Sequence, residues 1–202
     1  AGDIVYGTSV TGVLTRTAGE TAGTYTITQN TLTYGNNYDE TYVLDYLTIT
    51  KATTDVTDGN SATYTDTTIT FGDSDILLTP TSSNTADYTF TSSDSSVASI
   101  TTTSTNTASI RNMGVGSAEI TISQGADTNY QAKTVSYTII VNPLSVTVTP
   151  TATQSKTYGE ADLTLTYTTS PGLNSPLSNS STVTFTGALS RTAGTDASTY
   201  SI

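Results

Sequence analysis

The chain has 202 residues and a formal net charge of −11, yet only 11% of its residues are charged, so its polarity comes mainly from Thr and Ser. It contains no Cys and no His, which excludes disulfides, thiolate metal sites and any mechanism that uses His as a base or ligand. The acidic balance argues against nucleic acid and anionic membranes as partners, and no apolar run approaches the ~20 residues that cross a bilayer.

Short segments with alternating apolar residues follow one another along the chain. A period of two is what a half-buried strand requires, and clusters of Gly, Asn, Asp and Pro near positions 35–37, 58–60, 125–127 and 170–172 mark turns between the segments. About seven short strands in each ~90 residues is typical of an immunoglobulin-like sandwich. We therefore predict an all-β chain of tandem immunoglobulin-like β-sandwich domains, with strands at residues 24–28, 47–50, 118–122, 135–141, 144–148 and 163–167.

An internal repeat gives the domain organisation. Residues 12–27 read GVLTRTAGETAGTYTI, and residues 187–202, 175 positions later, read GALSRTAGTDASTYSI with ten of sixteen positions identical. A second pair, TFGDSDILLT at residues 70–79 and TYGEADLTLT at residues 157–166, is offset by 87 positions. The predicted period is thus about 87 residues, and the closer match recurs in every second repeat, which indicates two alternating domain types.

The repeat predicts two partial domains around a complete one. Residues 1–52 form the C-terminal part of one repeat, residues 53–143 a complete domain, and residues 144–202 the N-terminal part of a further repeat, with Pro143 between the last two. We expect the chain to be a stretch of a longer periodic protein that begins and ends inside domains.

Two segments of the last repeat carry a family resemblance. Residues 158–163, YGEADL, and residues 187–194, GALSRTAG, resemble the bacterial immunoglobulin-like repeats of the MBG group. Residues 2–52 resemble the later part of the same repeat, and the middle domain resembles a related bacterial immunoglobulin-like repeat through residues 92–100 and 114–120. The resemblance implies a long, repetitive, secreted or surface-exposed bacterial protein, often an adhesin.

Two pairs of carboxylates are candidate calcium ligands. Asp73 and Asp75 form an Asp-x-Asp, and Glu160 and Asp162 occupy the corresponding positions of the later repeat. Carboxylate oxygens are the ligands that Ca²⁺ prefers, although no segment matches a full calcium loop. The alternative is a turn that enters the first strand, in which the polar side chains cap backbone groups. No other cofactor is expected.

Two short motifs are candidate glycan acceptors. Asn179 begins an Asn-Ser-Ser sequence that fits the N-linked acceptor pattern. Thr67 lies in Asp-Thr-Thr, which resembles a short O-glycosylation motif. Both motifs are short enough to arise by chance in a chain rich in Ser and Thr.

The basic residues are interpreted as structural. Arg16 and Arg191 recur with the domain in Arg-Thr-Ala-Gly, so we predict that each binds backbone carbonyls or pairs with a carboxylate beside a turn. Lys51, Lys133 and Lys156 would form isopeptide bonds only if a buried Lys, Asn and acid met, and solvated lysines are the default expectation.

The sequence favours a mechanical role over catalysis. Without His there is no Ser-His-Asp triad, and no Gly-rich phosphate loop is present, so we expect no enzyme. We predict the stalk- or filament-forming repeat region of an extracellular or cell-surface adhesin-like protein. Its partners would be neighbouring repeats of the same protein, with lateral self-assembly into a filament. The alternative is a glycan- or protein-binding module that uses exposed tyrosines such as Tyr6, Tyr38 or Tyr88.

Overall fold

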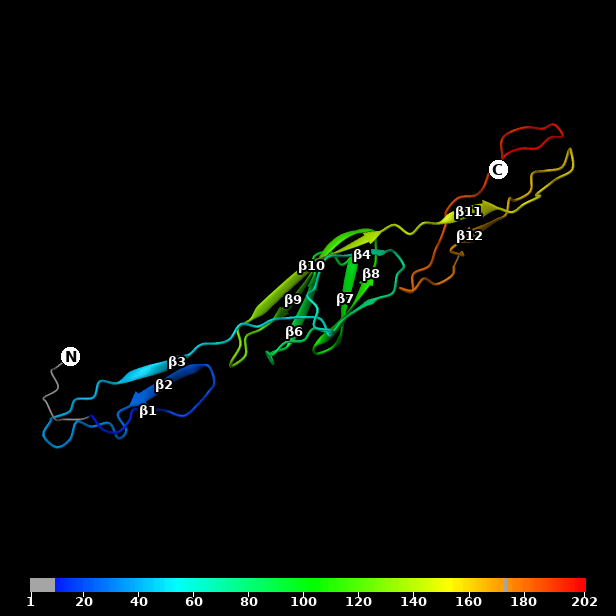
Figure 1. The fold of residues 1–202 in the computed structure, drawn as a ribbon. Coiled ribbons are helices and arrows are strands. Elements are labelled where there is room, and N and C mark those ends of the chain that lie inside the picture. The colour runs from blue at the N-terminus through cyan, green and yellow to red at the C-terminus, as the bar shows by residue number, and fades with distance from the viewer. Residues whose placement is uncertain (1–9, 173) are drawn as a thin grey trace. The chain divides into compact units, whose positions relative to one another are not determined.

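The computed structural model describes residues 10–172 and 174–202 (Figure 1). All regular elements in this described part are strands, which confirms the predicted all-β fold. They are β1 (Thr15–Arg16), β2 (Gly23–Thr28), β3 (Asp45–Ile49), β4 (Thr67–Thr70), β5 (Ile76–Leu78), β6 (Tyr88–Ser92), β7 (Ala98–Ser104), β8 (Thr107–Asn112), β9 (Gly116–Gln124), β10 (Lys133–Asn142), β11 (Thr147–Pro150) and β12 (Tyr167–Ser170).

The chain divides into two compact units. The first comprises Ala1–Val56, Ser82–Asp87 and Ser123–Thr134, and the second comprises Thr57–Thr81, Tyr88–Ile122 and Val135–Ile202. The predicted domain boundaries after residues 52 and 143 differ from this division and, like the period of about 87 residues, stay predictions.

The first unit is built on the antiparallel sheet β1-β2-β3. Thr15 and Arg16 of β1 pair with the end of β2, and five successive residues of β2 pair with β3, with Tyr25 opposite Leu47. Tyr25 and Ile27 are half-buried and Thr24 and Thr28 are exposed, but Thr26 is half-buried as well, so the predicted alternation holds only in part. Much of β3 is exposed to solvent, so this sheet buries little apolar surface.

The second unit contains a β-sandwich with a well-buried core. One sheet has the order β4-β10-β9-β6, in which β10 and β4 run parallel, and the other has the order β5-β8-β7 with antiparallel pairs. The predicted alternation holds from Ala118 in β9 and from Tyr137 in β10, where every second side chain is buried. Both sheets contribute to the core, which includes Leu78, Ala98, Ala108, Ile110, Ala118, Ile120, Ile122, Ile139 and Val141.

The last part of the second unit is an antiparallel pair of strands, β11 and β12. The strand predicted over residues 163–167 begins only at Tyr167. The side chain of Gln154 gives a physical reason, because its Oε1 accepts the Thr166 N–H at 2.6 Å and its Nε2 donates to the Thr151 and Thr166 carbonyls. The Gln154 side chain thus takes the Thr166 N–H that a longer ladder would use, although the Thr166 carbonyl still accepts the Thr151 N–H at 2.9 Å.

Candidate functional site

The repeated Arg-Thr-Ala-Gly sequence forms a compact structure beside β1. Arg16 Nη1 donates to the carbonyls of Thr17 at 3.1 Å and Gly19 at 2.5 Å, and the guanidinium lies over the Tyr25 ring, 5.1 Å from its centroid. The Tyr25 hydroxyl donates to the Thr21 carbonyl at 2.6 Å. A Cβ at Gly19 would lie 2.2 Å from the Tyr25 ring, so only glycine fits there. We call residues 16–27 the first arginine motif.

The second arginine motif, residues 191–202, repeats this geometry. Arg191 Nη1 donates to the carbonyls of Thr192 at 2.9 Å and Gly194 at 3.0 Å, and the guanidinium lies 5.0 Å from the Tyr200 ring centroid. The Tyr200 hydroxyl donates to the Asp196 carbonyl at 2.9 Å, and a Cβ at Gly194 would meet the Tyr200 ring at 2.0 Å. The prediction that the repeated arginine binds carbonyls beside a turn is confirmed at both positions.

The two arginine motifs differ in their carboxylate. Arg16 pairs with Glu20 of its own motif, whereas Arg191 Nη2 donates to both oxygens of Asp162 at 2.9 and 3.0 Å. Lys156 Nζ lies 2.6 Å from the same carboxylate. The hydrogen bond from Lys156, followed by that from Arg191, holds the pKa of Asp162 below its usual value.

Two of the calcium candidates cap turns. The Asp73 carboxylate accepts the Thr70 N–H at 2.8 Å, and the Glu160 carboxylate accepts the Thr157 N–H at 3.1 Å. In both turns the later residue also donates its own N–H to the carbonyl of the threonine. The corresponding positions of the two repeats therefore share one turn structure, which is the alternative that the sequence left open.

The other two candidates face cations. Asp75 pairs with Arg111 at 3.5 Å, and Asp162 pairs with Lys156 and Arg191. Within residues 10–172 and 174–202, no three acidic side chains gather where they could hold a metal ion. The calcium hypothesis thus stays a prediction without a ligand cluster to support it.

Asn179, the N-glycan candidate, is buried with only 1% of its surface exposed. Its Nδ2 donates to both the carbonyl and the Oδ1 of Asn112, at 2.9 and 2.7 Å, and its Oδ1 accepts the Ser181 N–H. The backbone N–H groups of Gly72 and Asn179 complete the cluster by donating to Asn112 Oδ1 and to the Gly72 carbonyl. The nitrogen that a glycan would modify is thus occupied, and we expect it to be unmodified in the folded chain.

Sequence reasoning missed this cluster, which we call the asparagine junction. One signal was available: Asn112 follows Ala108 and Ile110 at the inward positions of β8, where an apolar residue is the rule.

Thr67, the other glycan candidate, is the half-buried first residue of β4, and its hydroxyl donates to the Thr65 carbonyl at 3.1 Å. Its glycosylation stays a prediction.

A second polar junction lies in the first unit, where the segment after β3 meets residues 127–131; we call it the exit junction. Ala52 N–H donates to the Asn129 carbonyl and Gln131 N–H donates to the Ala52 carbonyl, both at 2.8 Å. Lys51 Nζ donates to the Asp127 carbonyl at 2.6 Å. This segment is thus fixed by backbone pairing and not only by side chains.

The carboxylate of Asp127 organises the loop at the exit junction. It accepts N–H groups from Thr85 at 2.9 Å, Asn129 at 2.8 Å and Tyr130 at 2.7 Å, and the Thr85 hydroxyl at 3.0 Å. These hydrogen bonds, led by the one from the Thr85 backbone, lower the pKa of Asp127 to about 2. Such bonds favour the charged carboxylate over the neutral acid.

The structure gives little support to tyrosine-based glycan binding. Tyr88 is a core residue, 8% exposed, so the expectation that it is exposed is wrong: the alternation of β6 turns it inward. Tyr6 lies outside the described residues. Tyr38 is exposed next to Tyr34, but the two rings are tilted by 60° and form no flat stacking platform.

The three lysines considered for isopeptide bonds, Lys51, Lys133 and Lys156, are all exposed. Exposed ammonium groups lack the buried environment that this chemistry requires. Two of them also have partners within the chain, because Lys51 Nζ donates to the Asp127 carbonyl and Lys156 Nζ pairs with Asp162.

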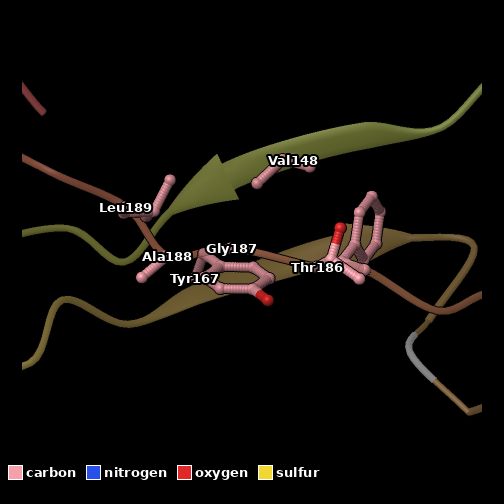
Figure 2. Close-up of a pocket in the computed structure, with 7 residues that line it drawn as sticks. Val148, Tyr167, Thr186, Gly187, Ala188 and Leu189 are labelled. Carbon is pink, nitrogen blue, oxygen red and sulfur yellow. The ribbon is translucent and has the colours of Figure 1, made fainter.

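A shallow pocket lies beside β11 and β12 (Figure 2). It encloses about 140 Å³ and is lined by Val148, Tyr167, Phe185, Thr186, Gly187, Ala188 and Leu189. No charged side chain lines it, and pockets that hold small ligands are usually larger, about 300 Å³ or more. The pocket is better described as an incompletely filled apolar core than as a ligand site.

Comparisons with known proteins bear on part of the chain. The comparison with curated proteins gives no match. A crystal structure of domains 4 and 5 of the S-layer protein SbsC is similar at 17% identity, with a TM-score of 0.33, over 60% of this chain and 66% of that one. The described residues contain no helix that is long and apolar enough to cross a membrane. The family model described as "MBG domain (YGX type)" matches residues 146–202, so the resemblance to that group is confirmed for this part of the chain.

Proposed function

We propose that the chain is a structural repeat region of a large bacterial cell-surface or secreted protein, in which folded repeats act as spacers in a stalk or filament. One observation carries the proposal: the most similar segments, 175 residues apart, fold into arginine motifs with the same carbonyl contacts and the same stacking of the guanidinium on tyrosine. In both copies the guanidinium donates hydrogen bonds to backbone carbonyls of the motif and pairs with a carboxylate. An arginine that recurs in the repeat and makes its hydrogen bonds and ion pair within the chain indicates a repeated structural element and not a recurring binding site.

The match of residues 146–202 to the MBG domain supports an extracellular or surface location. The composition agrees with this location, since an acidic, hydroxyl-rich surface favours solubility and discourages edge-to-edge aggregation. The sandwich core of the second unit provides stability without disulfides, as a chain without Cys requires.

The two polar junctions support a spacer role within each unit. The exit junction ties residues 51–52 to residues 127–131 by paired backbone hydrogen bonds. The asparagine junction ties residue 179 to residues 72 and 112 in a buried cluster. Directional hydrogen bonds between distant parts of a chain limit bending there, which is what a semi-rigid array of repeats needs.

Pulling on single molecules of the full chain tests the spacer role. We expect the sandwich to unfold in a discrete, forced step, and Asn179→Leu to lower the force at which the segment around residue 179 detaches. Asn36→Leu, an exposed asparagine in a turn of the first unit, is the matched control and should leave the forces unchanged. A chain that extends without any discrete step would contradict the proposal.

The competing function, a glycan- or protein-binding module, makes a different prediction. It requires saturable binding of the folded chain to an oligosaccharide or a partner protein, which a glycan array and a pull-down would detect. Specific binding that depends on Tyr34 or Tyr38, the exposed neighbouring pair, would favour the module over the spacer. No catalytic activity is expected in either case.

A further inference from the structure

We propose that the parallel strand pair β4–β10 is a mechanical clamp: when the chain is pulled at both ends, this pair is sheared and carries the load on the sandwich. We call residues 66–71 and 138–142 the strand clamp. The clamp adds to the proposed spacer role and rests on it, because only a chain under tension loads these strands. It follows from the directions of the two strands and from their places in the chain.

The two strands of the clamp lie at the two ends of the sandwich sequence, because β4 is the first of its strands and β10 is the last. They run parallel, with Thr67–Thr70 beside Ile139–Asn142 (Figure 1). Tension along the chain enters β4 at its N-terminal end and leaves β10 at its C-terminal end. In a parallel pair these two points lie at opposite ends of the ladder, so tension draws the strands past each other along their axes. An antiparallel pair would be pulled at one end of the ladder and would unzip.

Shear loads the hydrogen bonds of the pair together. Such bonds run from one strand to the other, so sliding the strands strains all of them at once, whereas unzipping breaks them one after another. The ladder between the two strands is extended at both ends. The Asp66 carboxylate accepts the Thr138 N–H at 2.7 Å, and the Phe71 N–H donates to the Asn142 carbonyl at 2.8 Å. The load is therefore shared from residue 66 to residue 71.

Burial protects the clamp on one face. Ile139 and Val141 are almost completely buried, and their partners in β4 are Thr67 and Ile69. Water, which competes for the hydrogen bonds of an opening ladder, therefore reaches this face only after the core separates. Because side chains alternate between the two faces of a strand, sliding β4 by one residue would also move Ile69 away from Val141 and break the match of their apolar faces.

The far end of β4 is anchored by the asparagine junction. β4 leads into the turn at residues 70–73, and the buried Asn112 of β8 holds this turn. Its Oδ1 accepts the Gly72 N–H and its Nδ2 donates to the Asp73 carbonyl, both at 2.8 Å. Since β10 belongs to one sheet and β8 to the other, tension on β4 is passed to both sheets of the sandwich.

Pulling on the full chain in two directions tests the clamp. Since the sequence has no native Cys, pairs of introduced cysteines set the points of attachment. Asn60→Cys with Ser145→Cys pulls β4 and β10 at opposite ends of their ladder, whereas Asn60→Cys with Ser136→Cys pulls them at the same end. All three positions are exposed, so the fold is the same in both experiments.

At the same constant force, we expect the folded sandwich to last about tenfold longer in the first geometry, which is the ratio expected when one or two more hydrogen bonds must break together. Equal lifetimes in the two geometries would overturn the clamp. They would leave the spacer role intact, because the sandwich would still unfold in a discrete step.

Removal of one hydrogen bond of the clamp provides the second readout. Asp66→Ala deletes the acceptor of the Thr138 N–H and should shorten the folded lifetime in the shearing geometry about fivefold. Asp94→Ala is the matched control, because Asp94 is also exposed and its carboxylate accepts the Ser96 N–H in the turn between β6 and β7. This control should leave the lifetime nearly unchanged. Equal effects of the two substitutions would show that general stability sets the lifetime and would overturn the proposal.

Discussion

The β-sandwich and the arginine motifs hold their structures by different means. In the sandwich, both sheets bury apolar side chains such as Ile120 and Ile139 completely. In the arginine motifs, the central guanidinium is partly exposed and is fixed by carbonyls, a tyrosine ring and a carboxylate. The difference predicts a graded response to substitution, because removing buried methyl groups costs more than removing partly solvated polar contacts.

The largest expected effect comes from the sandwich core. Ile139→Ala removes a fully buried side chain of β10 and should lower the free energy of unfolding by about 2–5 kcal/mol. Urea unfolding followed by circular dichroism measures this. The neighbouring Ile140, which is exposed, is the matched control, and its change to Ala should cost less than about 0.5 kcal/mol. Equal losses at both positions would remove the contrast between core and surface.

The asparagine junction should give an intermediate effect. Asn179→Leu removes the donor to Asn112 and leaves buried acceptors with fewer partners, which should cost about 1–3 kcal/mol. Thermal melting of the full chain measures the loss, and Asn179→Asp should not rescue it because a carboxylate cannot donate these bonds. A variant as stable as the parent would show that the cluster contributes nothing net.

The arginine motif should give a smaller effect. Arg191→Lys keeps the charge but loses the planar fork, in which one nitrogen donates to two carbonyls and the other to both oxygens of Asp162. We therefore expect a loss of about 1 kcal/mol, in the range of partly exposed ion pairs and cation–π contacts. Melting experiments at low and high salt separate the contributions. Arg16→Lys should behave alike if the carbonyl contacts dominate. A much larger loss of stability from one of the two substitutions would show that the carboxylate partner of the arginine dominates its contribution to stability.

The exit junction should respond to acid. The pKa of Asp127 in the folded chain is about 2, below its ordinary value of 3.8, so its stabilising effect is present above about pH 4 and is lost as the pH falls towards 2. Melting temperatures between pH 5 and pH 2 measure this. Asp127→Asn should flatten the acid dependence, whereas Asp39→Asn, at an exposed position, should not. The lowered pKa of Asp162 acts in the same direction.

The regular parts of this structure were predictable because their determinants are local. Burial at every second position from Ala118 to Ile122 in β9 and from Tyr137 to Val141 in β10 follows from apolar residues that recur with a period of two. The role of Arg16 and Arg191 was predictable for another reason, since a residue that recurs with the repeat serves the fold of the repeat.

The features that sequence reasoning missed depend on distant partners. Asn179 and Asn112 are 67 positions apart, and nothing in the Asn-Ser-Ser pattern indicates that its amide is buried. The strand predicted at residues 163–167 starts late because the side chain of Gln154 accepts the N–H of Thr166, which a longer ladder would use. The sequence alone does not place Tyr88 inside or outside, because its inward orientation depends on which face of β6 meets the core.

The absence of His and Cys has a consequence for the environments that the chain tolerates. No side chain has an ordinary pKa between those of the carboxylic acids, near 4, and those of Tyr and Lys, near 10. The arginines remain charged throughout this interval, and burial raises the pKa of Tyr64 further, to about 12. The side chains therefore take up and release almost no protons from mildly acidic to mildly alkaline water, and no thiol responds to oxidants. Between mildly acidic and mildly alkaline pH, the charges that hold the arginine motifs and the exit junction therefore stay the same.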